Sequence, residues 1–266
     1  MNDYAITDQQ LHWLSQIIAK ANRTFMPSKK DDILTNLYFD YVKDRILGRW
    51  IETDSGKYIL TFNLSNFHFE WLNASEEVIQ SVSSIGYHIA HIEKEISKGL
   101  PDLGLDPESF SDKLHFDIPK YLFSEEVVKK PNQDGLEKWR KYRNIANQAC
   151  DFALKYLHID AEIRIWPHHF DTGIYVEPND KTGIGFGLAM QDEMVGYPYF
   201  YLSGYSLHDE IDYSRLPELE NGRWEIGEYW KGAVLPLTLL ENLDNKTSNK
   251  VLNDFQEAAI SWFIKS

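Results

Sequence analysis

The sequence predicts an α+β protein in which four long helices pack on antiparallel sheets. Apolar residues recur at three- and four-residue spacing in four segments, whereas eight shorter segments are strand-like in pattern or composition. These strand-like segments come in two groups of four, each bracketed by helices. Short connections between successive strands are typical of antiparallel pairing. We therefore expect two antiparallel sheets or one continuous sheet, and we weigh an internal duplication of an α-β4-α unit.

The first half, residues 1–100, is expected to begin with a helix that starts near Thr7 or Asp8, because both residue types cap helix N-termini. Pro27 and the polar run 28–32 are expected to end this helix. Turn residues then separate four expected strands, at 37–43, 46–52, 58–64 and 67–72. This run predicts an antiparallel meander.

A second helix is predicted over residues 76–98, with Ser75 as its cap. Branched apolar residues recur along it at three- and four-residue spacing: Val78, Val82, Ile85, Ile89, Ile92 and Ile96. Gly99 and Pro101 would stop the helix. Residues 101–135 contain several prolines, and we expect an irregular connector there with one short strand at 114–118.

The second half, residues 136–266, is expected to repeat the order of the first. Helices are predicted at 136–157 and 248–264. Between them we expect four strands, the last one interrupted, at 162–176, 183–190, 197–205 and 223–236. An acidic loop is expected at 207–222. We expect the two halves and their connector to form one compact folding unit.

Composition limits the class of protein. The net charge is −14 and the pI about 5.0, and no basic stripe is present of the kind that binds nucleic-acid phosphates. The N-terminus carries no secretory signal pattern and no apolar run is long enough to span a bilayer, so we expect no membrane partner. The single cysteine, Cys150, lies in an apolar helical setting and is expected to be a buried thiol. Together these features predict a cytoplasmic protein.

The densest group of reactive side chains is the segment 166–173, inside the predicted strand 162–176. Alternate residues of a strand share a face, which gives two sets: Trp166, His168 and Phe170 against Pro167, His169 and Asp171. A carboxylate two residues from an imidazole can orient the ring and raise its basicity. His169 and Asp171 are therefore candidate catalytic residues for general base catalysis or metal ligation, and a buried structural pair is the alternative.

The two strands that follow combine glycine and aromatic residues. Gly183, Gly185 and Gly187 would share a face, which lets a helix, an aromatic side chain or a ligand approach the backbone. In strand 197–205 the alternate residues are Tyr197, Tyr199, Tyr201, Ser203 and Tyr205. Such a stripe forms either a packing layer or the wall of a small-molecule pocket. The candidate ligand-binding residues are Trp166, His168, His169, Asp171, Tyr199 and Tyr201, with Trp224 or Trp230 as a further wall.

Histidines elsewhere give a weaker metal-binding pattern. Three side chains would share one flank of the predicted helix 76–98: His88, His91 and Glu95. A metal site based on His169 and Asp171 would need a further ligand from elsewhere: His88, His91 or His115. No known metal or nucleotide signature occurs, and we expect no metal and no cofactor. The isolated histidines are expected at the surface or its boundary: His12, His68, His158 and His208.

Several short segments, in order along most of the chain, resemble an uncharacterised bacterial family that carries a Trp-Pro-x-x-Phe-Asp-like strand motif. The resembling segments are Leu11–Ile18, Leu37–Phe39, Trp166–Gly173, Gly183–Asp192 and Tyr197–Tyr205. That family has no known activity. The resemblance implies one continuous folding unit and supplies no reaction.

These observations favour a cytoplasmic protein that binds a small molecule in an aromatic, histidine-containing pocket on the second-half sheet. One alternative is a metal-dependent hydrolase that uses His169 and Asp171. Another is a scaffold that acts through protein contacts, including a homodimer built on tyrosine and tryptophan residues. The sequence leaves open whether the protein is an enzyme.

Overall fold

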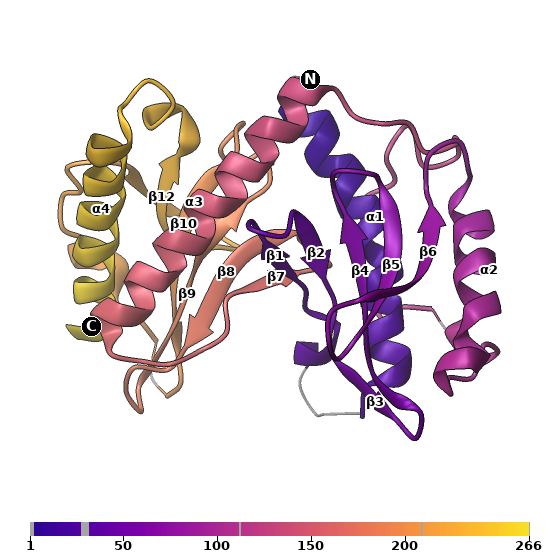
Figure 1. Ribbon diagram of the computed structural model, residues 1–266. Helices are drawn as coiled ribbons and strands as arrows, with labels where there is room; N and C mark the ends of the chain where they lie inside the picture. The colour runs from indigo at the N-terminus through magenta and orange to yellow at the C-terminus, as the bar shows by residue number, and fades with distance from the viewer. Residues whose placement is uncertain (1–2, 28–31, 112, 209, 266) are drawn as a thin grey trace. The chain divides into compact units, whose positions relative to one another are not determined.

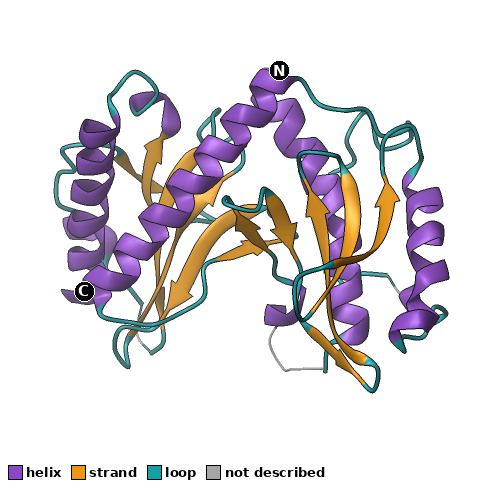
Figure 2. Cartoon of the chain, viewed as in Figure 1, coloured by secondary structure: helices purple, strands orange, loops and turns teal. Residues whose placement is uncertain are grey.

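The computed structural model describes residues 3–27, 32–111, 113–208 and 210–265. The chain divides into two compact units (Figure 1). The first unit comprises Met1–Lys141 with Ile165–Phe170, and the second comprises Tyr142–Arg164 with Asp171–Ser266. Four α-helices and two antiparallel sheets in the described residues confirm the predicted α+β class (Figure 2).

The first unit contains α1 (Asp3–Phe25), α2 (Ile89–Gly99) and an antiparallel sheet. The strands of this sheet are β1 (Tyr38–Asp40), β2 (Arg45–Leu47), β3 (Ile51–Thr53), β4 (Gly56–Asn63), β5 (His68–Asn73) and β6 (Val78–Ser83). The order across the sheet is β1-β2-β4-β5-β6, and β3 pairs with β4 beside this path. Helix α1 packs against β4, and α2 packs against β6 at the sheet edge.

Helix α1 confirms the first predicted helix but begins earlier than expected. Leu11, Leu14 and Ile18 are fully buried on its inner face. Thr7 does not cap the helix, because its hydroxyl donates to the Asp3 carbonyl one turn back, at 2.8 Å. Asp8 is also inside the helix and buried. The helix ends at Phe25, before Pro27, and residues 28–31 of the predicted stop lie outside the described residues.

The helix predicted over 76–98 is wrong in its first half, because residues 78–83 form strand β6 and only 89–99 form α2. The backbone amides of Ser75 and Glu77 donate to the Asn73 side chain, which closes a hairpin between β5 and β6 where Ser75 was expected to cap a helix. Gly86 then adopts φ +84°, a conformation that a helix cannot contain. Valine and isoleucine at helical spacing also suit a strand, so the pattern alone was ambiguous.

A buried carboxylate ties the middle strands of the first sheet together. Glu70 on β5 is 4% exposed and accepts hydrogen bonds from Arg45, at 2.6 Å, and from Asn63 and Asn66. Burial alone would raise the pKa of Glu70, but the hydrogen bonds from Asn66, Arg45 and Asn63 lower it below its ordinary value. The ionised carboxylate therefore stabilises the folded first unit.

The predicted connector is irregular, with short 3₁₀ helices at Leu100–Leu103 and Ser109–Ser111. The strand expected at 114–118 is absent from the described residues of this stretch. Helix α3 (Gln133–Leu157) confirms the helix predicted at 136–157. The boundary between the two units falls within α3, after Lys141. None of the described helices combines the length and apolar character needed to cross a bilayer.

The second unit contains the end of α3, α4 (Asn245–Lys265) and β8 (Asp171–Val176), β9 (Thr182–Ala189), β10 (Tyr199–Ser206), β11 (Arg223–Ile226) and β12 (Lys231–Pro236). These five strands pair antiparallel in the order β11-β12-β10-β9-β8. Helix α4 packs against β9, β10 and β12. Strands β11 and β12 are the two parts of the interrupted strand predicted at 223–236.

The strand predicted over 162–176 is two strands, β7 (Arg164–Trp166) and β8, separated by a turn at residues 167–170. The Phe170 amide donates to the Trp166 carbonyl at 2.6 Å, and Phe170 has φ +57°. Each half of the described chain has six strands between its helices, two more than the α-β4-α unit that we weighed. The duplication itself stays a prediction.

Candidate ligand site

The strand register gives the sheet of the second unit two chemically different faces. One face is apolar and fully buried: Ile174, Phe186, Leu188, Phe200 and Leu202. Gly204 belongs to this face, and a Cβ there would overlap the Phe263 ring of α4. Arg143 of α3 donates to Thr172 on the same face, at 2.8 Å. Helices α3 and α4 therefore both contact this apolar face.

The opposite face carries phenol and carboxylate groups, and we name it the tyrosine face: Asp171, Tyr175, Tyr199, Tyr201, Ser203 and Tyr205. Tyr175 and Tyr205 are 39% and 47% exposed, and their rings meet edge to face at 5.6 Å. Tyr199 and Asp171 are buried. The face thus runs from buried polar groups to an open aromatic surface.

The glycines of β9 lie beneath the tyrosine side chains. A Cβ on Gly187 would lie 3.0 Å from the Tyr201 hydroxyl oxygen, and a Cβ on Gly185 would lie 3.0 Å from Tyr205 Cε2. At Gly183 a Cβ would overlap Tyr175. The sequence left open whether a helix, an aromatic side chain or a ligand approaches these glycines. In the structure, aromatic side chains lie against them. A larger residue at Gly183 would displace the Tyr175 ring, whereas at Gly187 a Cβ would lie 2.5 Å from the Thr172 carbonyl oxygen of β8.

Asp171 and Tyr201 form the polar centre of the tyrosine face. The Tyr201 hydroxyl donates to Asp171 Oδ2, while Asp171 Oδ1 is buried and has no hydrogen-bond partner among the described residues. Burial and the neighbouring carboxylate hold the pKa of Tyr201 well above its ordinary value. Burial also raises the pKa of the Cys150 thiol, and Asp171 adds to the shift. Tyr201 is thus a neutral donor next to a carboxylate with a free acceptor position.

Further carboxylates surround the tyrosine face. Tyr199 donates to Asp192 at 2.6 Å, and Tyr175 donates to Glu177 at 3.1 Å. Burial raises the pKa of Tyr199, and the hydrogen bond to Asp192 raises it further. The phenols of this face therefore act as donors to carboxylates, and the surface potential around them is negative.

The two tryptophans considered as further walls lie on opposite faces. Trp224 packs on the apolar face, with ring centroids 4.9 Å from Trp262 and 5.7 Å from Phe263. Trp230 covers Gly232, where a Cβ would lie 2.6 Å from its ring. By the register of β10 and β12, Gly232 shares the side of the sheet that bears Tyr201. Trp230, and not Trp224, belongs with the tyrosine face.

The other predicted site residues, Trp166, His168 and His169, belong to the first unit. A backbone bridge between Leu37 and Ile165 holds this segment there. His168 and His169 lie in the turn, with ring centroids 4.3 Å apart, and His168 packs on Phe116 at 5.5 Å.

The alternating faces predicted for residues 166–171 are therefore wrong. The turn interrupts the strand, so His169 is exposed while Asp171 is buried at the start of β8. The hydrogen bond described for Asp171 comes from Tyr201 and not from His169.

The histidines considered as remote metal ligands are at the surface of the first unit. His88 precedes α2, and His91 stacks on Tyr87 with its Nε2 4.0 Å from Glu95. The His115 ring is hydrogen-bonded to the Arg23 guanidinium. Among the described residues, no three His, Cys, Asp or Glu side chains are grouped closely enough to hold a metal ion.

His12 was expected at the surface or its boundary, but it is 1% exposed. Its Nε2 lies 2.8 Å from the Pro167 carbonyl, which can only accept, so in the neutral ring Nδ1 accepts from Tyr121 at 2.6 Å. The ring also stacks on Phe170 at 5.1 Å. His12 thus anchors both the turn at 167–170 and the connector, a long-range role that no local pattern indicates.

Comparisons with protein-family models, curated proteins and solved structures find no match for this chain. The resemblance to an uncharacterised bacterial family therefore stays a prediction.

Proposed function

We propose that the protein binds a small molecule on the tyrosine face of its second sheet. The observation that carries this proposal is the free acceptor at Asp171 Oδ1 beside Tyr201, on a face that opens to solvent along Tyr175 and Tyr205. Buried polar atoms are nearly always hydrogen-bonded, so an unused carboxylate oxygen favours a ligand with an N–H or O–H donor.

The chemistry of the face favours a neutral or cationic ligand. Asp171, Asp192 and Glu177 accept hydrogen bonds from its tyrosines, and Glu225 pairs with Arg223 on β11. Ring faces attract cations, and phenols and carboxylates together hold the hydroxyls of polyols. We therefore expect amines or polyols to bind and carboxylates or phosphates to be excluded.

The proposal includes the cytoplasm as the place of action. The single cysteine, Cys150, is a buried free thiol, and no disulfide supports either unit in the described residues. Free thiols are typical of proteins from reducing compartments.

A thermal-shift screen on the full chain tests the proposal. Amines, polyols and anions would be tested on the wild type and on Asp171→Asn and Tyr201→Phe. Tyr156→Phe is the matched control, because it also removes a phenol hydroxyl, but one that lies on α3 and is hydrogen-bonded to Ser261. A ligand that raises the melting temperature of the wild type and control, but not of the site variants, supports the proposal. Equal shifts in all four proteins would refute it.

Metal ions added to this screen, together with light scattering, distinguish the two alternatives. Stabilisation by Zn²⁺ or Mn²⁺ alone that is lost in both His169→Ala and Asp171→Asn would favour a metal-dependent hydrolase. A dimer in light scattering, with no response to any small molecule, would favour an interaction scaffold.

A further inference from the structure

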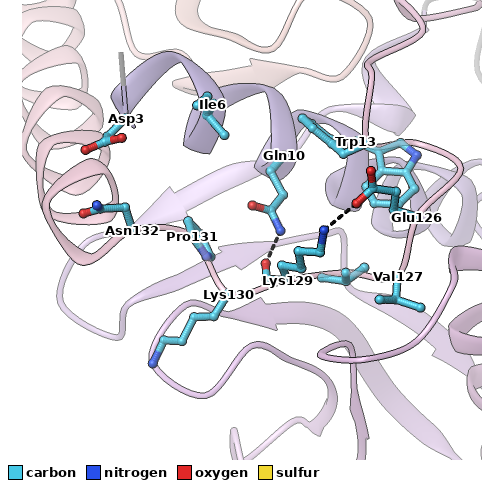
Figure 3. Close-up of a pocket in the computed structure, with 12 residues that line it drawn as sticks. Asp3, Ile6, Gln10, Trp13, Glu126, Val127, Lys129, Lys130, Pro131 and Asn132 are labelled. Atoms are coloured by element: carbon cyan, nitrogen blue, oxygen red, sulfur yellow. Dashed lines mark hydrogen bonds and ion pairs between the residues drawn. The ribbon is translucent and has the colours of Figure 1, made fainter. Parts of the chain in front are cut away.

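We infer that the first unit holds a second ligand site, a cavity between α1 and residues 123–132 that takes a small aromatic molecule with one hydrogen-bond donor. The site is independent of the tyrosine face, since all its lining residues belong to the first unit. The cavity has a volume of about 240 Å³. Figure 3 shows it between Ile6, Gln10 and Trp13 on one side and Val127, Lys129 and Pro131 on the other.

The helical wall follows from the sequence of α1. Asp3, Ile6, Gln10 and Trp13 recur at three- and four-residue spacing, so they form one stripe along the helix. This stripe borders the buried face, and Ile6 is 41% exposed whereas Gln10 is 7% exposed. The cavity is therefore deep at Gln10 and open near Ile6.

The opposite wall is held in place by hydrogen bonds on both sides. Gln10 Nε2 donates to the Lys129 carbonyl (Figure 3). The Val128 amide donates to the Tyr87 carbonyl and the Gly86 amide donates to the Val128 carbonyl, both at 2.8 Å. These bonds fix the backbone of the wall without a ligand. A preformed cavity loses little conformational entropy on binding.

The cavity offers aromatic surface in two orientations. Trp13 and Phe123 meet edge to face, with centroids 5.7 Å apart and planes at 62°. Phe123 in turn stacks on Tyr121 at 5.5 Å, and Tyr121 is bonded to His12. A ligand ring can therefore stack on one wall and present its edge to the other, the two geometries that aromatic pairs prefer.

Gln10 supplies the polar contact. Its amide nitrogen is used by Lys129, and its carbonyl oxygen, turned away from Lys129 in Figure 3, takes part in no hydrogen bond among the described residues. A side-chain carbonyl oxygen accepts only, so it selects a ligand with an N–H or O–H group. Lys129 Nζ is paired with Glu126 at 2.5 Å, which leaves this cation little attraction for an anionic ligand.

The volume limits the size of the ligand. A cavity of about 150 Å³ binds benzene, and drug-sized ligands need about 300 Å³ or more. At about 240 Å³ the cavity suits a bicyclic ring such as indole. Indole also carries one N–H donor, whereas benzothiophene has nearly the same shape and none. The pair therefore tests ring binding and donor recognition separately.

Titration calorimetry of the full chain with indole and benzothiophene tests the inference. Ile6→Trp would fill the mouth of the cavity, and Ile79→Trp is its matched control, since the two isoleucines are 41% and 40% exposed. We expect indole to bind the wild type and Ile79→Trp with a Kd below about 1 mM, and Ile6→Trp to bind at least about tenfold more weakly. Benzothiophene should bind the wild type about fivefold more weakly than indole, for want of the hydrogen bond.

No heat with indole, or equal affinity in Ile6→Trp and the wild type, would overturn the site. Equal affinity for the two ligands would overturn the role of Gln10 and leave an apolar cavity without donor selection. Circular dichroism melts show whether Ile6→Trp folds, and Val127→Trp, on the opposite wall, replaces it if it does not.

Discussion

Replacing Tyr201 by phenylalanine is expected to destabilise the second unit and to do so through Asp171. The substitution keeps the aromatic ring and removes only the hydroxyl, the Tyr201 atom that lies nearest to Gly187. Asp171, 8% exposed, then loses the hydrogen bond at Oδ2, and its Oδ1 already has no partner among the described residues. A largely buried carboxylate would remain without either bond.

The size of the effect follows from the charge on the acceptor. A hydrogen bond to a charged group contributes about 1.5–3 kcal/mol to stability. For a chain of this length, about 1 kcal/mol shifts the melting temperature by about 2–4 °C. We therefore expect Tyr201→Phe to lower the melting temperature by about 3–12 °C. In an Asp171→Asn background the acceptor is neutral, and the same change should cost only about 1 kcal/mol.

Urea denaturation of the four members of this double-mutant cycle measures the coupling between the two residues. Tyr205→Phe is the control, because its hydroxyl is on an exposed residue and lies 3.3 Å from Ser203. It should change the free energy of unfolding by less than about 0.5 kcal/mol. The reasoning fails if Tyr201→Phe is no more destabilising than Tyr205→Phe, or if its cost is unchanged by Asp171→Asn.

Three further predictions concern stability. Glu70→Gln should lower the free energy of unfolding by about 3 kcal/mol at pH 7 and by much less at pH 3, as measured in urea titrations. The reason is that the pKa of Glu70 is lowered in the folded protein, so the ionised carboxylate stabilises the fold above pH 4.5 and this stabilisation is lost as the pH falls. Gly204→Ala should cost about 1–3 kcal/mol, since the new methyl overlaps Phe263, and an unchanged melting temperature would contradict the described packing. Burial raises the pKa of Tyr199 and Tyr201, so their contribution is complete below about pH 10 and lost as the pH rises further. Denaturation at pH 8 and pH 11 should show the lower stability at pH 11, and Tyr199→Phe should reduce the difference.

Much of the secondary structure could be predicted because its signals are local. The apolar stripe of α1 and the alternation of Tyr199, Tyr201 and Tyr205 on β10 both follow from the repeat of a single element. The α+β class followed from the order of these elements. The pattern at 78–96 misled us because β-branched residues at helical spacing suit both structures, and the decision came from an Asn73 turn and from Gly86.

The candidate site was only partly predictable. Asp171 and Tyr201 were both candidates, but their partnership depends on the pairing of β8 with β9 and of β9 with β10. Predicting His169 as the partner of Asp171 assumed a continuous strand, which the turn ending at Phe170 interrupts. The cavity beside Gln10 was missed, because its second wall comes from a connector with no periodic pattern.

By itself the sequence determined the class of the fold, the acidic surface and the tyrosine stripe, because composition and residue spacing act within one element. Only the tertiary structure decided which side chains meet: Tyr201 with Asp171, tyrosine rings over the glycines of β9, and His12 with Pro167. The two hydrogen-bonded pairs among these contacts are 30 and 155 positions apart in the chain. Their geometry depends on strand register and helix placement, which packing of the whole unit sets.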